Sequence, residues 1–145
     1  MADVHEVFAV VALAANAIAA VWGAASWIRA DPSRVFWYLL RVAQATVVIQ
    51  VVIGVALLAE GRRPPDDLHY VYAVSPLIVA LVTEAMRATA SEKELEQFDD
   101  PEALPRREQI LVARKIVLRE MGIMTVGLLL VVTLLLRAAA SGGLF

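Results

Sequence analysis

Four long apolar stretches, separated by short polar segments, make up most of the sequence. They cover about residues 7–28, 35–59, 68–86 and 116–136. A helix needs roughly 20 apolar residues to cross about 30 Å of hydrocarbon, and each stretch is of that order. The chain is 60% hydrophobic and only 19% charged, whereas soluble domains are about 45–50% apolar and about 25% charged. The sequence therefore predicts an all-α integral membrane protein, with residues 1–145 forming a single up-down four-helix bundle.

Residues that typically begin and end helices flank these stretches. Side-chain caps and proline favour a helix start, and glycine favours a helix end. A second capping-box pattern, Ser91 with Glu94, predicts a short additional helix after the third stretch. No proline interrupts residues 106–137, so we expect the fourth helix to project beyond the bilayer at its start. The other signals are Asp3 with Glu6, Asp31-Pro32, and Asp66 or Asp67 for starts, and Gly61 for an end.

Lysine and arginine are distributed unequally between the two sides of the predicted bundle. Since basic residues favour the cytoplasmic side, the sequence predicts that both termini are extracytoplasmic and that loop 87–115 is cytoplasmic. This topology is that of a multi-pass protein of a bacterial inner membrane, and the mixed-charge loop 87–115 is a candidate contact with other membrane subunits. The side with the termini carries Arg62, Arg63 and Arg137, and the other carries Arg29, Arg34, Arg87, Lys93, Arg106, Arg107, Arg114 and Lys115.

Small and polar residues recur at spacings of three and four within three of the stretches. Residues at these spacings share one helix face. Membrane helices turn such faces toward one another, because small residues let backbones approach and polar groups avoid lipid. We therefore expect three stripes to face the interior: His5, Ala9, Ala12, Asn16, Ala19 and Gly23; Thr46, Gln50 and Gly54; and His69, Ala73, Pro76, Ala80 and Thr83.

The only two histidines of the chain begin the first and third stretches, at the same predicted level of the membrane. In an up-down bundle these two helices are diagonal, and neighbouring axes about 8–10 Å apart place them roughly 11–14 Å from one another. A planar macrocycle with one imidazole on each side fits such a gap. We therefore predict haem b as a cofactor, with His5 and His69 as the metal (haem iron) ligands and Arg62 and Arg63 near the propionates.

Two other interpretations of the histidines stay open. Both imidazoles can be interfacial polar groups that close the end of the bundle without binding anything. They can also bind a divalent metal with help from nearby carboxylates. The candidate carboxylates are Glu6, Glu60, Asp66 and Asp67.

A second polar group lies near the predicted cytoplasmic edge. Its members are Arg41, Gln44, Glu84, Arg119 and Glu120. Charges in lipid usually pair with one another, so we interpret the group as a structural polar cluster. The alternative is a proton or ion relay. The absence of a carboxylate at mid-depth argues against a proton-driven transporter.

Several classes of function are excluded or unsupported. The chain has no cysteine, which excludes disulfides, thiolate metal sites and cysteine nucleophiles. A formal net charge of -2 makes a nucleic-acid partner improbable. No phosphate-binding loop, zinc-protease motif or nucleophile elbow is found, so catalytic residues are not predicted and an enzyme is not favoured.

The segment from Gly61 to Tyr72, GRRPPDDLHYVY, resembles one found in small uncharacterised bacterial four-span inner-membrane proteins. The preceding Arg41-x-x-Gln44 and Gln50-x-x-x-Gly54 patterns fit the same resemblance, which implies an inner-membrane location and no particular activity. The paired histidines are similar in arrangement to those of four-helix b-type cytochromes.

Three functions follow as hypotheses. The first is b-type haem binding for electron transfer or haem handling near the outer face. The second is a cofactor-free accessory or structural subunit of a larger membrane complex. The third is a small-solute or ion pathway through the bundle.

Overall fold

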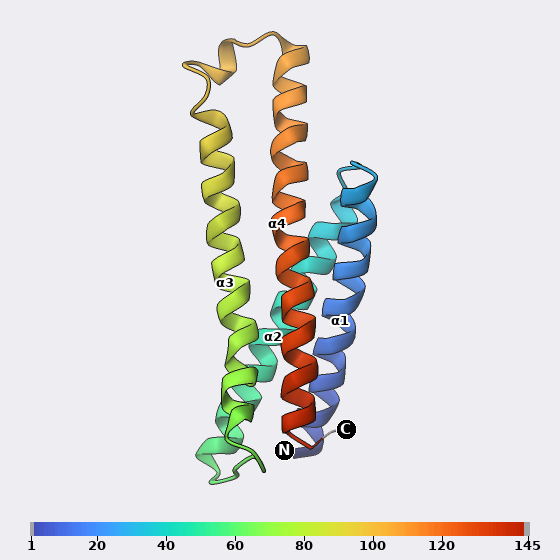
Figure 1. Cartoon of the computed structure of the whole chain (residues 1–145), viewed down its shortest axis with the longest axis vertical. Coiled ribbons are helices and arrows are strands. Elements are labelled where there is room, and N and C mark those ends of the chain that lie inside the picture. The colour runs from blue at the N-terminus through green and yellow to red at the C-terminus, as the bar shows by residue number, and fades with distance from the viewer. Residues whose placement is uncertain (1, 144–145) are drawn as a thin grey trace.

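The computed structural model of the chain describes residues 2–143, which form four long helices joined by short loops (Figure 1). Residues 2–143 contain no strand. Each long helix is long and apolar enough to cross a membrane, which confirms the prediction of an all-α four-helix membrane protein. The helices are α1 (Ala2–Ile28), α2 (Arg34–Ala59), α3 (Leu68–Leu95) and α4 (Arg106–Ser141), with a short 3-10 helix, η1, at Pro101–Ala103.

The four long helices pack in a ring in which α1 and α3 are diagonal. α4 packs against both α1 and α3, whereas α2 packs well against α1 and only sparingly against α3. The beginnings of α1 and α3 and the end of α4 lie at one end of the bundle (Figure 1). We call this the histidine end, because His5 and His69 lie there. At the opposite end, α3 and α4 continue beyond α1 and α2 (Figure 1), and we call residues 87–115 the arm.

The arm is more helical than the sequence suggests. α3 continues to Leu95 and α4 begins at Arg106, so only residues 96–105 connect them. The separate short helix predicted at Ser91 is wrong, because no proline or glycine interrupts the chain there. Ser91 Oγ instead donates to the Arg87 carbonyl at 3.2 Å. The prediction that the fourth helix extends past its apolar stretch is confirmed: its 36 residues span about 54 Å at 1.5 Å per residue.

The helix ends show which capping signals the chain uses. α2 begins after Ser33, whose Oγ accepts from the Phe36 backbone N–H at 3.3 Å, so the predicted cap at Asp31-Pro32 is wrong by two residues. The Trp22 indole donates to the same oxygen at 2.9 Å, which fixes the α1–α2 turn. Gly61 ends the second helix in a left-handed conformation with φ of 80°, as predicted. That conformation favours glycine because it lacks a Cβ.

The small-residue stripes face the interior, as predicted. Ala12, Asn16, Ala19 and Gly23 of α1 are all buried. Asn16 Nδ2 donates to the Ala12 carbonyl at 2.8 Å and to the Ala43 carbonyl at 3.3 Å, which ties α1 to α2 in mid-bundle. A hydrophobic cluster around it joins α1, α2 and α4, and it contains Ala19, Ala20, Phe36, Leu40, Ala43, Met121, Met124 and Leu128.

At Gly23, α1 packs closely against α2 and α4, and this position gives a direct test of the packing. A Cβ at this position would lie 2.5 Å from Phe36 Cε2 and 2.5 Å from Thr125 Oγ1. We expect Gly23→Val to lower the free energy of unfolding in detergent by about 1–3 kcal/mol, the usual range for overpacking a core. The control is Ala14→Val, at an exposed position of the same helix. Equal stability of the two variants would contradict this packing.

Candidate functional site

A cavity of about 380 Å³ lies at the histidine end, within the range of small-molecule sites. All four helices and the α2–α3 loop contribute to its wall. From α1 come His5 and Ala9, and from α2 come Gln50, Gly54 and the apolar side chains at 51, 55, 57 and 58. The loop contributes Arg62, Arg63 and two prolines. From α3 come His69, Tyr70, Ala73 and Val74, and from α4 come Leu135, Ala138, Ala139 and Gly142. The wall is mainly apolar with a few convergent polar groups.

His5 is half-buried near the beginning of α1 and is held against α2 by Gln50. The Gln50 amide nitrogen lies 3.3 Å from each ring nitrogen of His5 and donates to the His5 carbonyl at 3.2 Å. Gly54, one turn further along α2, lies beside the ring, where a Cβ would be in ordinary van der Waals contact with His5 Cε1 at 3.5 Å. The Gln50 carbonyl oxygen is buried and accepts no hydrogen bond from any group in residues 2–143.

His69 is oriented by the end of α4. Its Nδ1 lies 2.9 Å from the Ala138 carbonyl oxygen. Because a carbonyl oxygen only accepts, this contact assigns the proton to Nδ1 and leaves Nε2 with a free lone pair. Gly142 lets the ring come this close, since a Cβ there would lie 3.0 Å from both Nδ1 and Cε1. A backbone carbonyl on the distal nitrogen is the usual support of a metal-ligating histidine.

The structure brings the two imidazoles together across the diagonal of the bundle. Their ring centroids are 6.3 Å apart and their planes make an angle of 66°. Two imidazoles on opposite sides of one iron have centres about 6 Å apart, from bonds of about 2 Å and about 1 Å between each nitrogen and its ring centre. Around a tetrahedral ion the centres would approach to about 5 Å. The observed separation of the ring centroids lies nearer to the first of these two values.

The charged residues near the histidines do not form a metal site with them. Across residues 2–143, no group of three or more His, Cys, Asp or Glu side chains could hold a metal ion. Glu6 lines the cavity, whereas Glu60, Asp66 and Asp67 do not. Asp66 is used locally, where its Oδ1 accepts from the Leu68 backbone N–H at 2.9 Å. The structure thus gives no support to a divalent metal bound with these carboxylates.

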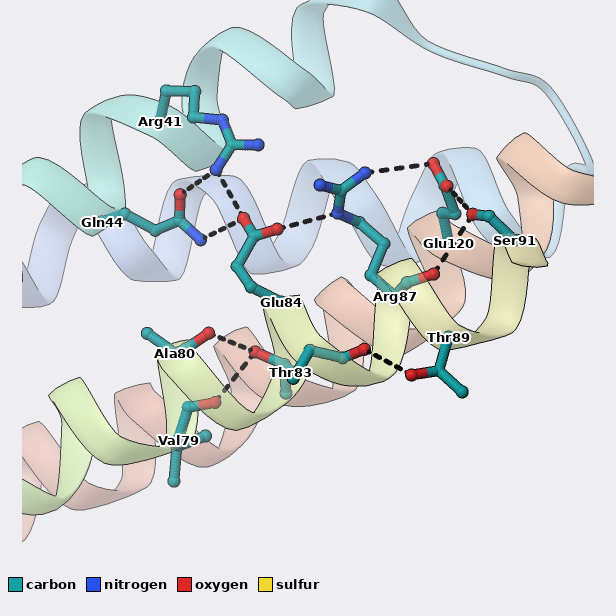
Figure 2. A network of polar contacts seen from close by, with 11 residues as sticks. Arg41, Gln44, Val79, Ala80, Thr83, Glu84, Arg87, Thr89, Ser91 and Glu120 are labelled. Carbon is teal, nitrogen blue, oxygen red and sulfur yellow. Dashed lines mark hydrogen bonds and ion pairs between the residues drawn. The ribbon is translucent and has the colours of Figure 1, made fainter. Parts of the chain in front are cut away.

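Most of the structural polar cluster forms a single network at the level where the arm leaves the bundle (Figure 2). Glu84 accepts from Arg41 at 2.5 Å, from Gln44 at 2.9 Å and from Arg87 at 2.8 Å. Arg87 continues to Glu120 at 3.6 Å. Ser91 also donates to Glu120. The network thereby links α2, α3 and α4.

The predicted member Arg119 lies elsewhere. It pairs with Glu94 on α3, and Lys115 pairs with the same carboxylate at 2.7 Å. Glu94 is buried between the two helices of the arm. These pairs fasten α3 to α4. The arm is also tied to the α1–α2 turn, because Arg114 donates to the Ala30 carbonyl at 2.9 Å.

An apolar layer separates the histidine cavity from the charged network. It consists of Ala12, Val47, Val131 and Leu135, all buried, with Leu13, Leu77 and Val79 packed against them. The cavity therefore ends inside the bundle. This arrangement suits binding at one end better than passage from end to end.

The sequence pattern does not predict several of the groups at these sites. Arg87 joins the network from a position counted only as a loop charge. Two groups at the histidine end, the Ala138 carbonyl and Gly142, carry no side-chain signal, and only the fold brings them to His69. Gln50 lies on a predicted stripe. Its spacing of four residues from Gly54 places both on one face of α2, which is the sequence signal that Gln50 faces the interior.

The site and fold define a four-helix, multi-pass type of membrane protein with a ligand-sized cavity at one end. No family model matches the chain, and neither the curated proteins nor the solved structures that were searched include a match.

Proposed function

We propose that the histidine cavity binds one b-type haem, with His69 Nε2 and a ring nitrogen of His5 as axial ligands. The observation that carries the proposal is the 6.3 Å between the two ring centroids, together with the origin of the rings on diagonal helices. This is about the separation that a trans pair of imidazoles adopts on one iron. The Ala138 contact leaves Nε2 of His69 as the free donor atom.

The rest of the cavity wall is compatible with such a ligand. Small residues, Ala9, Gly54 and Ala73, surround the gap beside the imidazoles and leave space for a flat ring. Arg62 and Arg63 line the cavity at the loop, where their guanidinium groups can bind propionate carboxylates in the bidentate manner that arginine favours. The apolar side chains of α2 and α4 in the wall would shield the bound group from water.

Electron transfer or haem handling is the role that this coordination supports. A haem with two histidine ligands supplies a reversible one-electron couple and has no open position for oxygen chemistry. The residues of the chain would fix the two imidazoles, shield the group from water and neutralise its carboxylates. The apolar layer below the cavity disfavours the third hypothesis, a solute or ion pathway. From the lysine and arginine distribution, we place the cavity near the outer face of a bacterial inner membrane.

The arm favours a second candidate function, that of an accessory subunit. Leu95, Ile110 and Leu111 are exposed apolar side chains on it. They lie beyond the ends of α1 and α2, where a lone protein would present them to water. Exposed apolar groups of this kind mark contact sites when they are contiguous. A partner in a larger membrane complex would cover them without any cofactor in the chain.

Absorption spectroscopy tests the proposed function directly. We expect protein from haem-replete cells, purified in detergent, to show a Soret band and, after reduction, the sharp visible bands of low-spin haem. Titration of the haem-free protein with haemin should saturate at one equivalent per chain. The control is the same purification from cells that carry an empty vector. Protein without a Soret band, before and after haemin is added, would overturn haem binding and leave the subunit hypothesis.

A further inference from the structure

The histidine cavity is exposed on one side in a way that suits a ligand arriving from the membrane. Three of the apolar side chains that line it are largely exposed: Val55 at 60%, Leu58 at 47% and Val74 at 44%. The first two belong to α2 and the third to α3. On the α4 side the lining residues Leu135 and Ala138 are each only 8% exposed. The cavity is therefore open at the boundary between α2 and α3, which we call the seam, and also at the end of the bundle, where Glu6, Arg62 and Arg63 are exposed.

The packing of the bundle explains why the seam is open. α2 and α3 make the least extensive contact of the neighbouring helix pairs. Both helices also present a small residue to the cavity, Gly54 on α2 and Ala73 on α3, and these two positions fill less of the gap between the helices than larger side chains would. In a bilayer, the exposed valines and leucine at the seam would face acyl chains, since they lie on membrane-spanning helices.

The two kinds of chemistry at the cavity are arranged as an amphiphile requires. The seam is apolar, whereas the basic groups, Arg62 and Arg63, lie in the loop at the end of the bundle. A ligand with a flat apolar body and carboxylates at one edge could slide in from the lipid with its body between the helices. Its carboxylates would stay at the polar boundary, where arginines interact well with them.

We propose that the cavity exchanges its ligand with the adjacent lipid leaflet through the seam, and that the incoming ligand is haem dissolved in that leaflet. The inference rests on the proposed function, because it takes haem as the ligand. It adds the source of the ligand and the route by which it enters and leaves. Entry from water through the end of the bundle is the alternative that the test must separate.

Cross-linking across the seam provides that test, because the chain has no cysteine of its own. The variant Val55→Cys/Val74→Cys is treated with a flexible bifunctional maleimide that joins the two thiols. The matched control is the same variant treated with a monofunctional maleimide, which adds bulk without a link. Haem-free protein in liposomes then receives haemin either dissolved in the membrane or carried in water by albumin, and absorbance is followed over time.

The cross-link should slow loading from the membrane by about tenfold or more, which corresponds to an increase of about 1.4 kcal/mol in the activation free energy. It should also slow the loss of bound haem to an excess of haem-free myoglobin. Equal rates for linked and control protein, with a normal final spectrum, would overturn the seam as the route and leave haem binding intact. Loading that is slowed from albumin alone would also overturn it.

A readout without haem separates failure of the route from failure of the proposed function. In Ala73→Cys the thiol lines the cavity at the seam. In liposomes we expect it to react faster with a lipid-soluble maleimide than with a permanently charged thiol reagent of similar reactivity. A faster reaction with the charged reagent would show that the cavity is filled from water and would overturn the inference, even if the protein binds no haem.

Discussion

Replacing His69 with alanine is expected to abolish the low-spin haem spectrum of the protein. Nε2 of His69 is the better prepared of the two donor atoms, because the Ala138 carbonyl fixes the opposite nitrogen and Gly142 admits the ring. Loss of only a group that supports a ligand typically lowers metal-site affinity by about 10–100-fold, and His69→Ala would remove the ligand itself. We expect His69→Ala to retain little haem, as measured by the haem-to-protein ratio. The haem that remains bound should be five-coordinate, as measured by the position of the Soret band.

The corresponding change at the other histidine should be milder. His5 is held by the flexible side chain of Gln50, with contacts of 3.3 Å. His5→Ala should therefore keep haem on His69 as a five-coordinate, high-spin complex of lower affinity. Adding free imidazole should restore the six-coordinate spectrum in this variant, because the cavity left by the ring accepts it. A purely structural histidine would not show such rescue.

Ser75→Ala supplies the control for both substitutions. Its hydroxyl donates only to the Val71 carbonyl of its own helix, at 2.6 Å, so its loss should leave the spectrum unchanged. A wild-type spectrum in His69→Ala would contradict axial ligation by this residue. Loss of the spectrum in Ser75→Ala would instead indicate general sensitivity of the fold and remove the value of the comparison.

The membrane fold was largely predictable from the sequence, and the reason is physical. Lipid forces backbone groups to bond within the helix, so a run of about 20 apolar residues has one stable outcome. The same solvent turns Asn16, Gln50 and Thr83 inward, which made the interior stripes readable from spacing alone. The sequence also placed His5 and His69 at one level on diagonal helices, whereas the 6.3 Å approach of their rings is known only from the structure.

What the sequence did not predict depends on contacts between distant segments. Ser33 rather than Asp31 caps α2. Its hydroxyl oxygen accepts hydrogen bonds both from the Phe36 backbone N–H and from the indole N–H of Trp22, a residue of the preceding helix. Glu94 draws Arg119 away from the polar cluster, since the arm continues as two paired helices where a loop was expected. Backbone groups such as the Ala138 carbonyl leave no trace in a residue pattern. Each of these required the tertiary structure to be known first.

Neutralising Glu84 is expected to destabilise the bundle more than any other single change in the polar network. Its carboxylate accepts from Arg41, Gln44 and Arg87 at 2.5–2.9 Å, and its side chain is only 25% exposed. In Glu84→Gln an amide NH₂ of the same shape replaces one accepting oxygen, which leaves the two arginines under-compensated. Breaking a buried pair from one side costs about 3–5 kcal/mol. We expect about 2–4 kcal/mol, because Arg41 is partly exposed and water offsets some of its loss.

The measurement is the free energy of unfolding of detergent-solubilised or bicelle-embedded protein. Glu92→Gln is the matched control, since Glu92 is an exposed carboxylate two turns further along α3. The double variant Glu84→Gln/Arg41→Met should lose less stability than the sum of the single variants, because it removes a charge together with its partner. Glu84→Gln that unfolds like Glu92→Gln would show that the network does not hold α2 to α3. In that case Glu84 would not contribute to stability, and the alternative interpretation of the cluster, a proton or ion relay, would be favoured.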